Sequence, residues 1–131
     1  MIVDASALLA VVLAEPDGRR LAEIIASASR PRMPAPTWFE AALAIESRGD
    51  ELASHRFDDA VRDLGIELIA FTPEHARSAR EARRIYGRAQ HPARLNFGDC
   101  LVYGVAKVER EPLLFKGNDF AQTDIEPALK D

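Results

Sequence analysis

Short apolar segments and longer segments with helical spacing alternate along the whole chain, and this alternation constrains the fold more than any other feature. The expected strands span residues 1–4, 33–36, 66–71 and 112–115. The expected helices span residues 7–14, 19–28, 37–48, 54–64, 73–86 and 96–109. Strands that alternate with helices form a parallel sheet covered on both faces. We therefore predict an α/β fold with a central, mostly parallel sheet.

The prolines and the tail add local expectations to this pattern. Pro34 and Pro36 favour a strand end or a sheet edge for the second strand, because proline donates no ladder hydrogen bond. Thr72 and Asn96 are expected to cap the helices that follow them. The tail from Lys116 is expected to be loop with a short strand near residues 124–125.

Length, apolar runs and charge exclude several classes of protein. A chain of 131 residues is expected to form a single domain, residues 1–131. No apolar run approaches about 18 residues, so we expect no membrane span. The start lacks a basic region, and Asp4 interrupts its apolar run, so we expect no signal peptide. The single cysteine, Cys100, fits a reducing cytoplasm and a small buried side chain. The net charge of −4 argues against nucleic-acid binding if taken alone.

Four acidic residues fall where strands end or helices begin, and these positions share one edge of an α/β sheet. They are Asp4, Glu40, Asp99 and Asp119. Each also has a structural reading. Glu40 and Asp99 stand three residues after a capping side chain, and Asp119 could be a turn residue. Asp4 is harder to explain in this way, because Ser6 is the expected cap of the first helix.

Clustered carboxylates suit hard cations such as Mg²⁺ or Mn²⁺, and no Cys/His spacing indicates zinc. Such a site supports hydrolysis at phosphorus by a metal-activated water. Without a cation the carboxylates would raise one another's pKa values. A receiver-like phosphate-signalling domain also uses acids and Mg²⁺, but it needs an aspartate at the end of a central strand. The segment at residues 66–71 ends without one.

Four motifs in this order resemble the PIN-domain ribonucleases, specifically the VapC-type toxins of type II toxin–antitoxin systems. The motifs are Met1–Ser6, the lone Glu40, Leu95–Cys100 and Leu113–Phe120. The resemblance implies a three-layer α/β/α fold, Mg²⁺-dependent RNA cleavage leaving a 5′-phosphate, a homodimer and inhibition by a cognate VapB-type antitoxin. Transfer RNA is the frequent target in the family. The remaining alternative is a non-catalytic PIN-fold binding module.

The family's acidic quartet maps onto Asp4, Glu40, Asp99 and Asp119, which would be both the catalytic and the metal-binding residues. Asn118 or Asp124 could share the role of the fourth acid. The resemblance also assigns supporting positions to Ser6 and Asn96.

An arginine-rich stretch follows His75 and could hold RNA. Arg77, Arg80, Arg84 and Arg88 recur at spacings of three and four, so they could form one stripe that leads towards Asn96. Guanidinium groups match phosphate well. The alternative is a solvated helix face. Of the neighbouring aromatic residues Trp38 and Phe39, we expect one to be core and the other to be available to a partner or a second copy.

Overall fold

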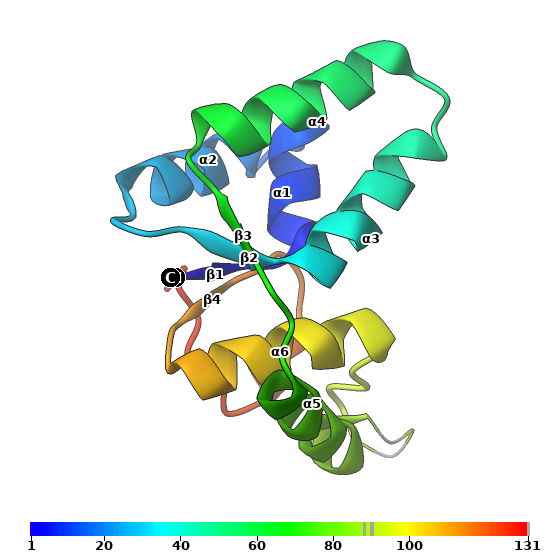
Figure 1. Ribbon diagram of the computed structural model, residues 1–131, viewed down its shortest axis with the longest axis vertical. Helices are drawn as coiled ribbons and strands as arrows, with labels where there is room; N and C mark the ends of the chain where they lie inside the picture. Colours follow the sequence, from blue (N-terminus) through cyan, green and yellow to red (C-terminus); the bar gives the residue numbers. More distant parts are fainter. Residues whose placement is uncertain (88, 90, 131) are drawn as a thin grey trace.

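The computed structural model describes residues 1–87, 89 and 91–130, and its centre is a parallel sheet with strand order β3-β2-β1-β4 (Figure 1). The strands are β1 (Ile2–Val3), β2 (Arg32–Pro34), β3 (Glu67–Ile69) and β4 (Leu113–Leu114). The helices are α1 (Ala5–Val12), α2 (Gly18–Ser27), α3 (Ala35–Glu46), α4 (Glu51–Asp63), α5 (Pro73–Tyr86), α6 (Phe97–Glu109) and the short 3₁₀ helix η1 (Phe120–Gln122). No helix in this described part is long and apolar enough to cross a membrane.

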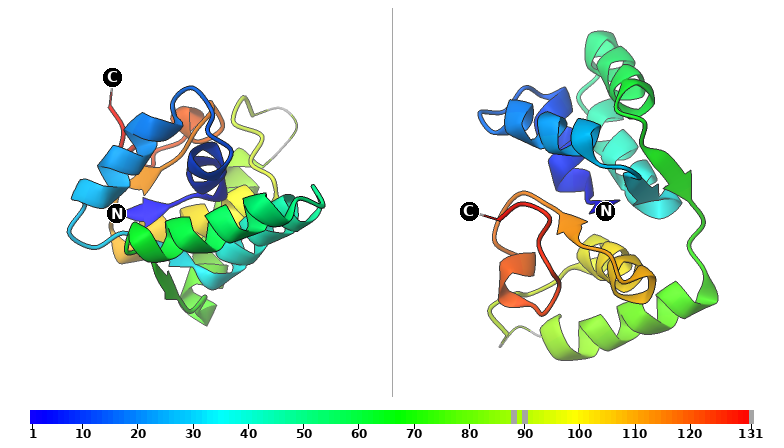
Figure 2. Two further views of the ribbon diagram at one scale, coloured as in Figure 1. Left: turned by 90° about the horizontal axis from the view of Figure 1, so that it is seen from above. Right: turned by 90° about the vertical axis from the view of Figure 1, so that its left-hand side faces the viewer.

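The sheet separates two layers of helices, which confirms the three-layer α/β/α prediction. Helices α1 to α4 cover one face, and α5 and α6 cover the other (Figures 1 and 2). Successive strand residues point to opposite faces. Ile2 and Leu113 therefore pack against α5 and α6, while Val3 and Leu114 pack against α1, α3 and α4. Both strands are buried on both sides, which explains why they are apolar throughout.

The second strand, β2, does not lie at the edge of the sheet, which was one of the two positions expected from its prolines. It lies between β1 and β3, so it is an interior strand and not an edge strand. Pro34 is tolerated there because it is the last residue of β2, paired with Ile69, where the ladder ends. The strand-end reading of Pro34 was right, and the sheet-edge reading was wrong. The short strand expected at residues 124–125 is absent from the described chain. Instead, Pro127 forms an isolated bridge with Leu113.

A buried ion network closes the edge of the sheet at which the strands begin. Arg32 is 9% exposed and donates to Glu109 at 3.3 Å and to Glu111 at 2.7 Å. The amino terminus pairs with Glu111 at 3.0 Å, and His75 Nε2 lies 3.0 Å from Glu109. These contacts satisfy charges that would otherwise be costly to bury. These contacts lie where the strands begin, whereas the four candidate acids lie where the strands end. The edge with the acids is therefore not occupied by this network.

Candidate active site

Asp4 directly follows β1 and is 5% exposed. Its carboxylate accepts hydrogen bonds from the Ser6 amide at 3.1 Å and the Ser6 hydroxyl at 2.5 Å. Asp4, and not Ser6, is therefore the N-cap of α1, which corrects the sequence expectation. The reason is that α1 starts at Ala5, so Ser6 is already helical. Burial raises the pKa of Asp4 above its usual value, although the bonds from Ser6 oppose this effect.

Ser6 joins the start of α1 to the loop that leaves β4. Its hydroxyl donates to Asp4 and accepts the amide hydrogen of Lys116 at 3.0 Å. The Lys116 ammonium in turn pairs with Glu15 and, at 3.1 Å, with Asp17. The loop that carries Asp119 is thereby attached to the start of α1, where Asp4 is the N-cap.

Glu40 lies one turn further into its helix than the sequence suggested. Helix α3 begins at Ala35, so Thr37 is already helical, and the capping box expected between Thr37 and Glu40 does not form. The Glu40 carboxylate lies against Gly98: a Cβ at position 98 would stand 2.1 Å from Glu40 Oε2. Burial, and then repulsion from Asp4, raises the pKa of Glu40.

Asp99 has both the structural role and the position expected of a site residue. Its amide donates to Asn96 Oδ1 at 2.8 Å, and the Asn96 amide donates to Asp99 Oδ2 at 3.1 Å, which is a complete capping box. The pKa of Asp99 is nevertheless raised to about 7, first by burial and then by repulsion from Asp4 and Asp119, against the lowering effect of the Asn96 amide. One carboxyl group thus caps α6 and faces other acids at the same time.

Asp119 and Asp124 differ in their surroundings. Asp119 is exposed on the loop after β4, and its charge acts on both Asp4 and Asp99. Asp124 instead accepts hydrogen bonds from the Tyr103 hydroxyl and, at 2.5 Å, from Lys107, which hold its pKa below the usual value despite partial burial. Asp119 is therefore the better fourth member of the acidic group.

None of the four acids forms an ion pair with a basic side chain of the described residues. Within the described chain, no group of three or more Asp, Glu, His or Cys side chains is placed so that it could hold a metal ion as it stands. The donor set consists of carboxylates, which suit Mg²⁺ or Mn²⁺. The missing side chain of Gly98 leaves space for the Glu40 carboxylate beside the first turn of α6. The chemistry of these donors fits a hard divalent cation, whose charge would offset the repulsion that raises the pKa values of Asp4, Glu40 and Asp99.

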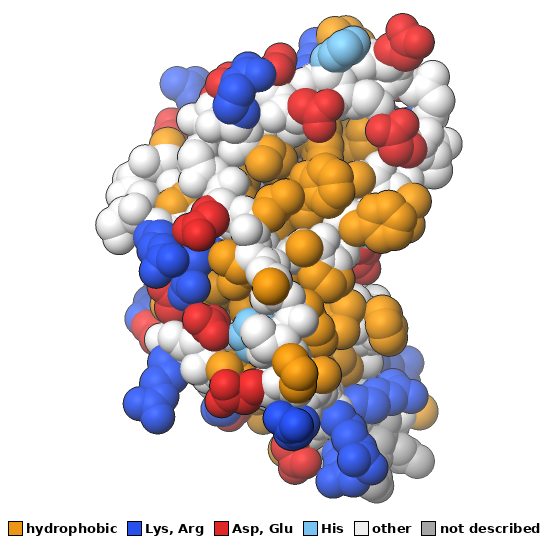
Figure 3. Space-filling model, viewed as in Figure 1, with side chains coloured by type: hydrophobic (Ala, Val, Ile, Leu, Met, Phe, Trp, Pro, Cys, Tyr) orange, Lys and Arg blue, Asp and Glu red, His pale blue; other side chains and the backbone are white. Residues whose placement is uncertain are grey.

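The arginines of α5 divide into two groups. Arg80 and Arg83 line a cavity of about 660 Å³ that extends to Asn96 and Phe97. Arg77 and Arg84 are exposed, and Arg84 pairs with Glu81 at 3.7 Å. Arg88 lies outside the described residues. Figure 3 shows basic side chains gathered at the lower end of the molecule, over α5.

Two residues of this region were missing from the candidates drawn from the sequence. Arg83 is closer to α6 than Arg84 is, because it borders the buried face of α5 formed by His75, Ala79 and Ala82. That face was readable from helical spacing. Gly98 had no local signal, since its importance depends on the Glu40 carboxylate from another helix.

The two aromatic residues at the start of α3 are now distinguished. Trp38 packs against the core, with its ring 6.0 Å from that of Phe57. Phe39 is 57% exposed, near Phe97, which is 81% exposed. Cys100 is buried, as expected for a small apolar side chain.

Comparison with known proteins agrees with this architecture. The family model described as PIN domain matches residues 1–126. The VapC ribonuclease Mb0640 of Mycobacterium bovis is 40% identical over 125 residues, covering 95% of each chain.

Two solved structures share the fold at 17% identity. One is the Mycobacterium tuberculosis toxin VapC20, described as cleaving the sarcin–ricin loop, with a TM-score of 0.72 and coverage of 95% of each chain. The other is a toxin–antitoxin complex from Klebsiella pneumoniae, with a TM-score of 0.67 and coverage of 92% of this chain and 89% of that one. The chain belongs to the PIN-domain family, among the VapC-type ribonuclease toxins.

Proposed function

We propose that this protein is a metal-dependent endoribonuclease that hydrolyses RNA, with Asp4, Glu40, Asp99 and Asp119 as its catalytic and metal-binding residues. One observation carries the proposal: acidic residues from separate parts of the chain lie near one another at the edge where β1 and β4 end. Besides the larger effect of burial, Asp4 raises the pKa values of Glu40 and Asp99, and Asp119 raises those of Asp4 and Asp99. Such mutual repulsion stabilises nothing in the fold. It is the arrangement expected of a site completed by a cation.

The residues of the chain divide the work as follows. Asp4 and Asp99 would hold Mg²⁺ or Mn²⁺ with Asp119, while Glu40 completes the donor set from α3. The bound cation would supply an activated water and neutralise charge on the phosphate. Ser6 orients the Asp4 carboxylate through its hydroxyl, and Asn96 orients Asp99 through the capping box. We expect the product to carry a 5′-phosphate, because water and not the RNA 2′-hydroxyl is the nucleophile.

The arginines of α5 are proposed to hold the substrate. Arg80 and Arg83 line the cavity that leads to Asn96, and Arg77 extends the basic surface along the helix. Phosphate contacts of this kind supply most of the affinity for nucleic acid. We propose tRNA or another structured RNA as the substrate, in line with the description of VapC20 as a toxin that cleaves the sarcin–ricin loop.

We also propose that the protein is a cytoplasmic homodimer neutralised by a cognate VapB-type antitoxin. A hollow of about 400 Å³ lies between α3 and the start of α6, lined by Phe39, Leu43, Phe97 and Leu101. Three of these side chains are more than half exposed, which is a large apolar surface for a chain of this size. The relationship to a solved toxin–antitoxin complex supports a protein partner.

Growth arrest on expression tests the enzymatic proposal against the alternative of a non-catalytic binding module. Wild-type protein should arrest growth and generate new RNA ends with 5′-phosphates, whereas Asp4→Asn should do neither. Purified protein should lose cleavage in EDTA and recover it with Mg²⁺ or Mn²⁺. Equal arrest by both proteins would favour binding over cleavage, and a 2′,3′-cyclic phosphate product would reject hydrolysis by water.

A further inference from the structure

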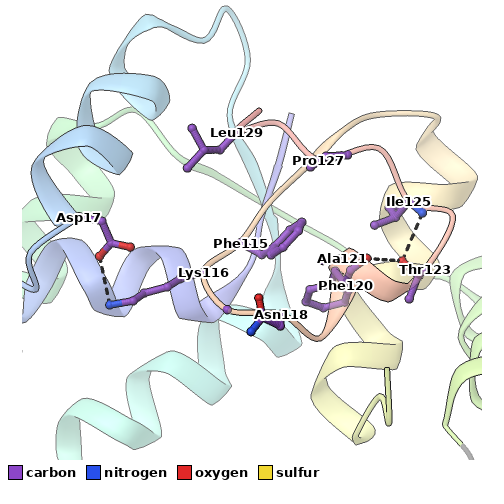
Figure 4. Close-up of a pocket in the computed structure, with 11 residues that line it drawn as sticks. Asp17, Phe115, Lys116, Asn118, Phe120, Ala121, Thr123, Ile125, Pro127 and Leu129 are labelled. Atoms are coloured by element: carbon purple, nitrogen blue, oxygen red, sulfur yellow. Dashed lines mark hydrogen bonds and ion pairs between the residues drawn. The ribbon is translucent and has the colours of Figure 1, made fainter. Parts of the chain in front are cut away.

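A pocket of about 450 Å³ lies beside the loop that carries Asp119 (Figure 4). It is formed by the exit of β4, the helix η1 and the chain that follows it. Its lining includes Phe115, Lys116, Asn118, Thr123, Pro127 and Leu129. None of the four acids lines it, so it is distinct from the candidate cation site. Its volume falls within the range of about 300–1,000 Å³ typical of small-ligand pockets.

The pocket combines an aromatic, apolar wall with one free amide. The Phe115 ring is half-buried and is fixed against the Phe120 ring, with centroids 5.2 Å apart. Pro127 and Leu129 extend the apolar wall. Asn118 is exposed and forms no hydrogen bond with the described residues, so its carboxamide is available as both donor and acceptor.

The charges around the pocket do not suit an anion. Lys116 is the basic residue of its lining, but its ammonium is already paired with Glu15 and with Asp17, which also lines the pocket. The Thr123 hydroxyl is also engaged, because it donates to the Phe120 carbonyl at 2.7 Å and accepts the Ile125 amide at 3.3 Å. What remains is a ring face and an amide edge. That pair recognises a flat, uncharged heterocycle with hydrogen-bonding groups on its rim, and not a phosphate.

The pocket is linked to the candidate catalytic group through the backbone. Asn118 immediately precedes Asp119, and the Lys116 amide donates to the Ser6 hydroxyl that holds Asp4. The pocket and Asp119 thus share one loop, so a polynucleotide cleaved at the acids can extend an adjoining nucleotide towards the pocket. Single-stranded or flipped-out bases are commonly bound by stacking on an aromatic side chain and by hydrogen bonds to the base edge.

We propose that this pocket receives one unstacked base of the RNA substrate next to the cleaved phosphodiester, with Phe115 as the stacking surface and Asn118 as the residue that reads the base edge. This inference rests on the proposed ribonuclease function. It adds a specificity-determining site for a nucleobase, separate from the phosphate contacts of α5.

The test measures base preference and not total activity. A short RNA with randomised nucleotides on both sides of the cut is cleaved, and the new ends are sequenced. We expect wild-type protein to favour one base at one fixed position. Asn118→Ala should reduce the ratio of the best to the worst base at that position about tenfold, because one base-edge contact is removed. Gln122→Ala, an exposed change outside the pocket, should keep the wild-type ratio.

A second measurement does not depend on cleavage. In the Asp4→Asn background, removing the base from the RNA at the preferred position should weaken binding. The penalty for the missing base should be smaller in the Asp4→Asn/Phe115→Leu form, because the stacking contact is already lost and only the Asn118 contact remains to be removed. Thermal unfolding verifies that Phe115→Leu is folded.

Three outcomes would overturn the inference. An unchanged base ratio in Asn118→Ala, with RNA cleavage intact, rejects the base pocket and leaves the nuclease proposal standing. The inference is also rejected if removing the base weakens RNA binding equally in Asp4→Asn and in Asp4→Asn/Phe115→Leu. This outcome does not depend on cleavage. If these pocket variants lose binding to a partner protein while their RNA preference is unchanged, the pocket binds a side chain of that partner and not a base.

Discussion

The replacement Asp99→Asn should stabilise the metal-free protein at alkaline pH. Asn keeps the size of the side chain and an oxygen that can still accept the Asn96 amide of the capping box. The replacement removes a carboxyl group whose pKa rises from 3.8 to about 7 on folding. Since the folded state binds its proton more tightly than the unfolded state, Asp99 favours folding when protonated and opposes it when ionised.

The size of the effect follows from that shift. A pKa change from 3.8 to about 7 corresponds to an upper limit of roughly 4 kcal/mol at about 1.4 kcal/mol per tenfold. Asp99 is only partly buried, so solvent screening reduces this to about 1–2 kcal/mol. For a chain of this length, we expect the melting temperature to rise by about 3–8 °C.

The assay is thermal unfolding of EDTA-treated protein between pH 4 and pH 8.5. The wild type should lose stability as the pH rises from about 4 through about 7, and Asp99→Asn should lose less, so that the two proteins converge near pH 4. Asp58→Asn on the exposed face of α4 is the matched control and should show little difference at any pH. A neutral or destabilising effect of Asp99→Asn at pH 8.5 would refute the repulsion argument. So would a stabilising effect of the same size at both ends of the pH range.

Three further predictions concern single side chains. Gly98→Ala should displace the Glu40 carboxylate, since the new Cβ would lie 2.1 Å from it, and reduce RNA cleavage at least about tenfold; cleavage within twofold of wild type would show that Glu40 can move without cost. Asp119→Asn should abolish cleavage with little loss of stability. Asp124→Asn should instead lower the melting temperature, because it weakens the pair with Lys107 and the hydrogen bond from Tyr103. The reverse pattern in cleavage and unfolding assays would exchange the two roles. Thr37→Val should raise stability by about 1 kcal/mol, because the Thr37 hydroxyl is buried with no hydrogen-bond partner among the described residues; a lower denaturation midpoint would indicate that the hydroxyl has a partner in solution.

The order of strands and helices was predictable because it is encoded by local patterns. The apolar pairs of β1 and β4 are buried on both sides, and Thr72 and Asn96 cap their helices as the spacing indicated. Even so, some helices begin two or three residues earlier than the sequence predicted, because a proline or an acid precedes the predicted start and takes the N-cap position. Helix α3 begins at Ala35 and α4 at Glu51, after the Asp50 cap. Those shifts decided that Glu40 is not part of a capping box.

The sequence by itself determined the fold class, the list of acidic candidates and their place at the ends of strands and starts of helices, because residue spacing and capping act over a few neighbouring residues. Only the tertiary structure decided that β2 lies inside the sheet, that Asp124 is paired while Asp119 faces the other acids, and that Gly98 makes room for Glu40. It likewise placed Arg83 beside α6 and exposed Phe39. Burial and repulsion between charges depend on residues far apart in the chain, and these are brought together only when the sheet sets its register and the helices pack on it.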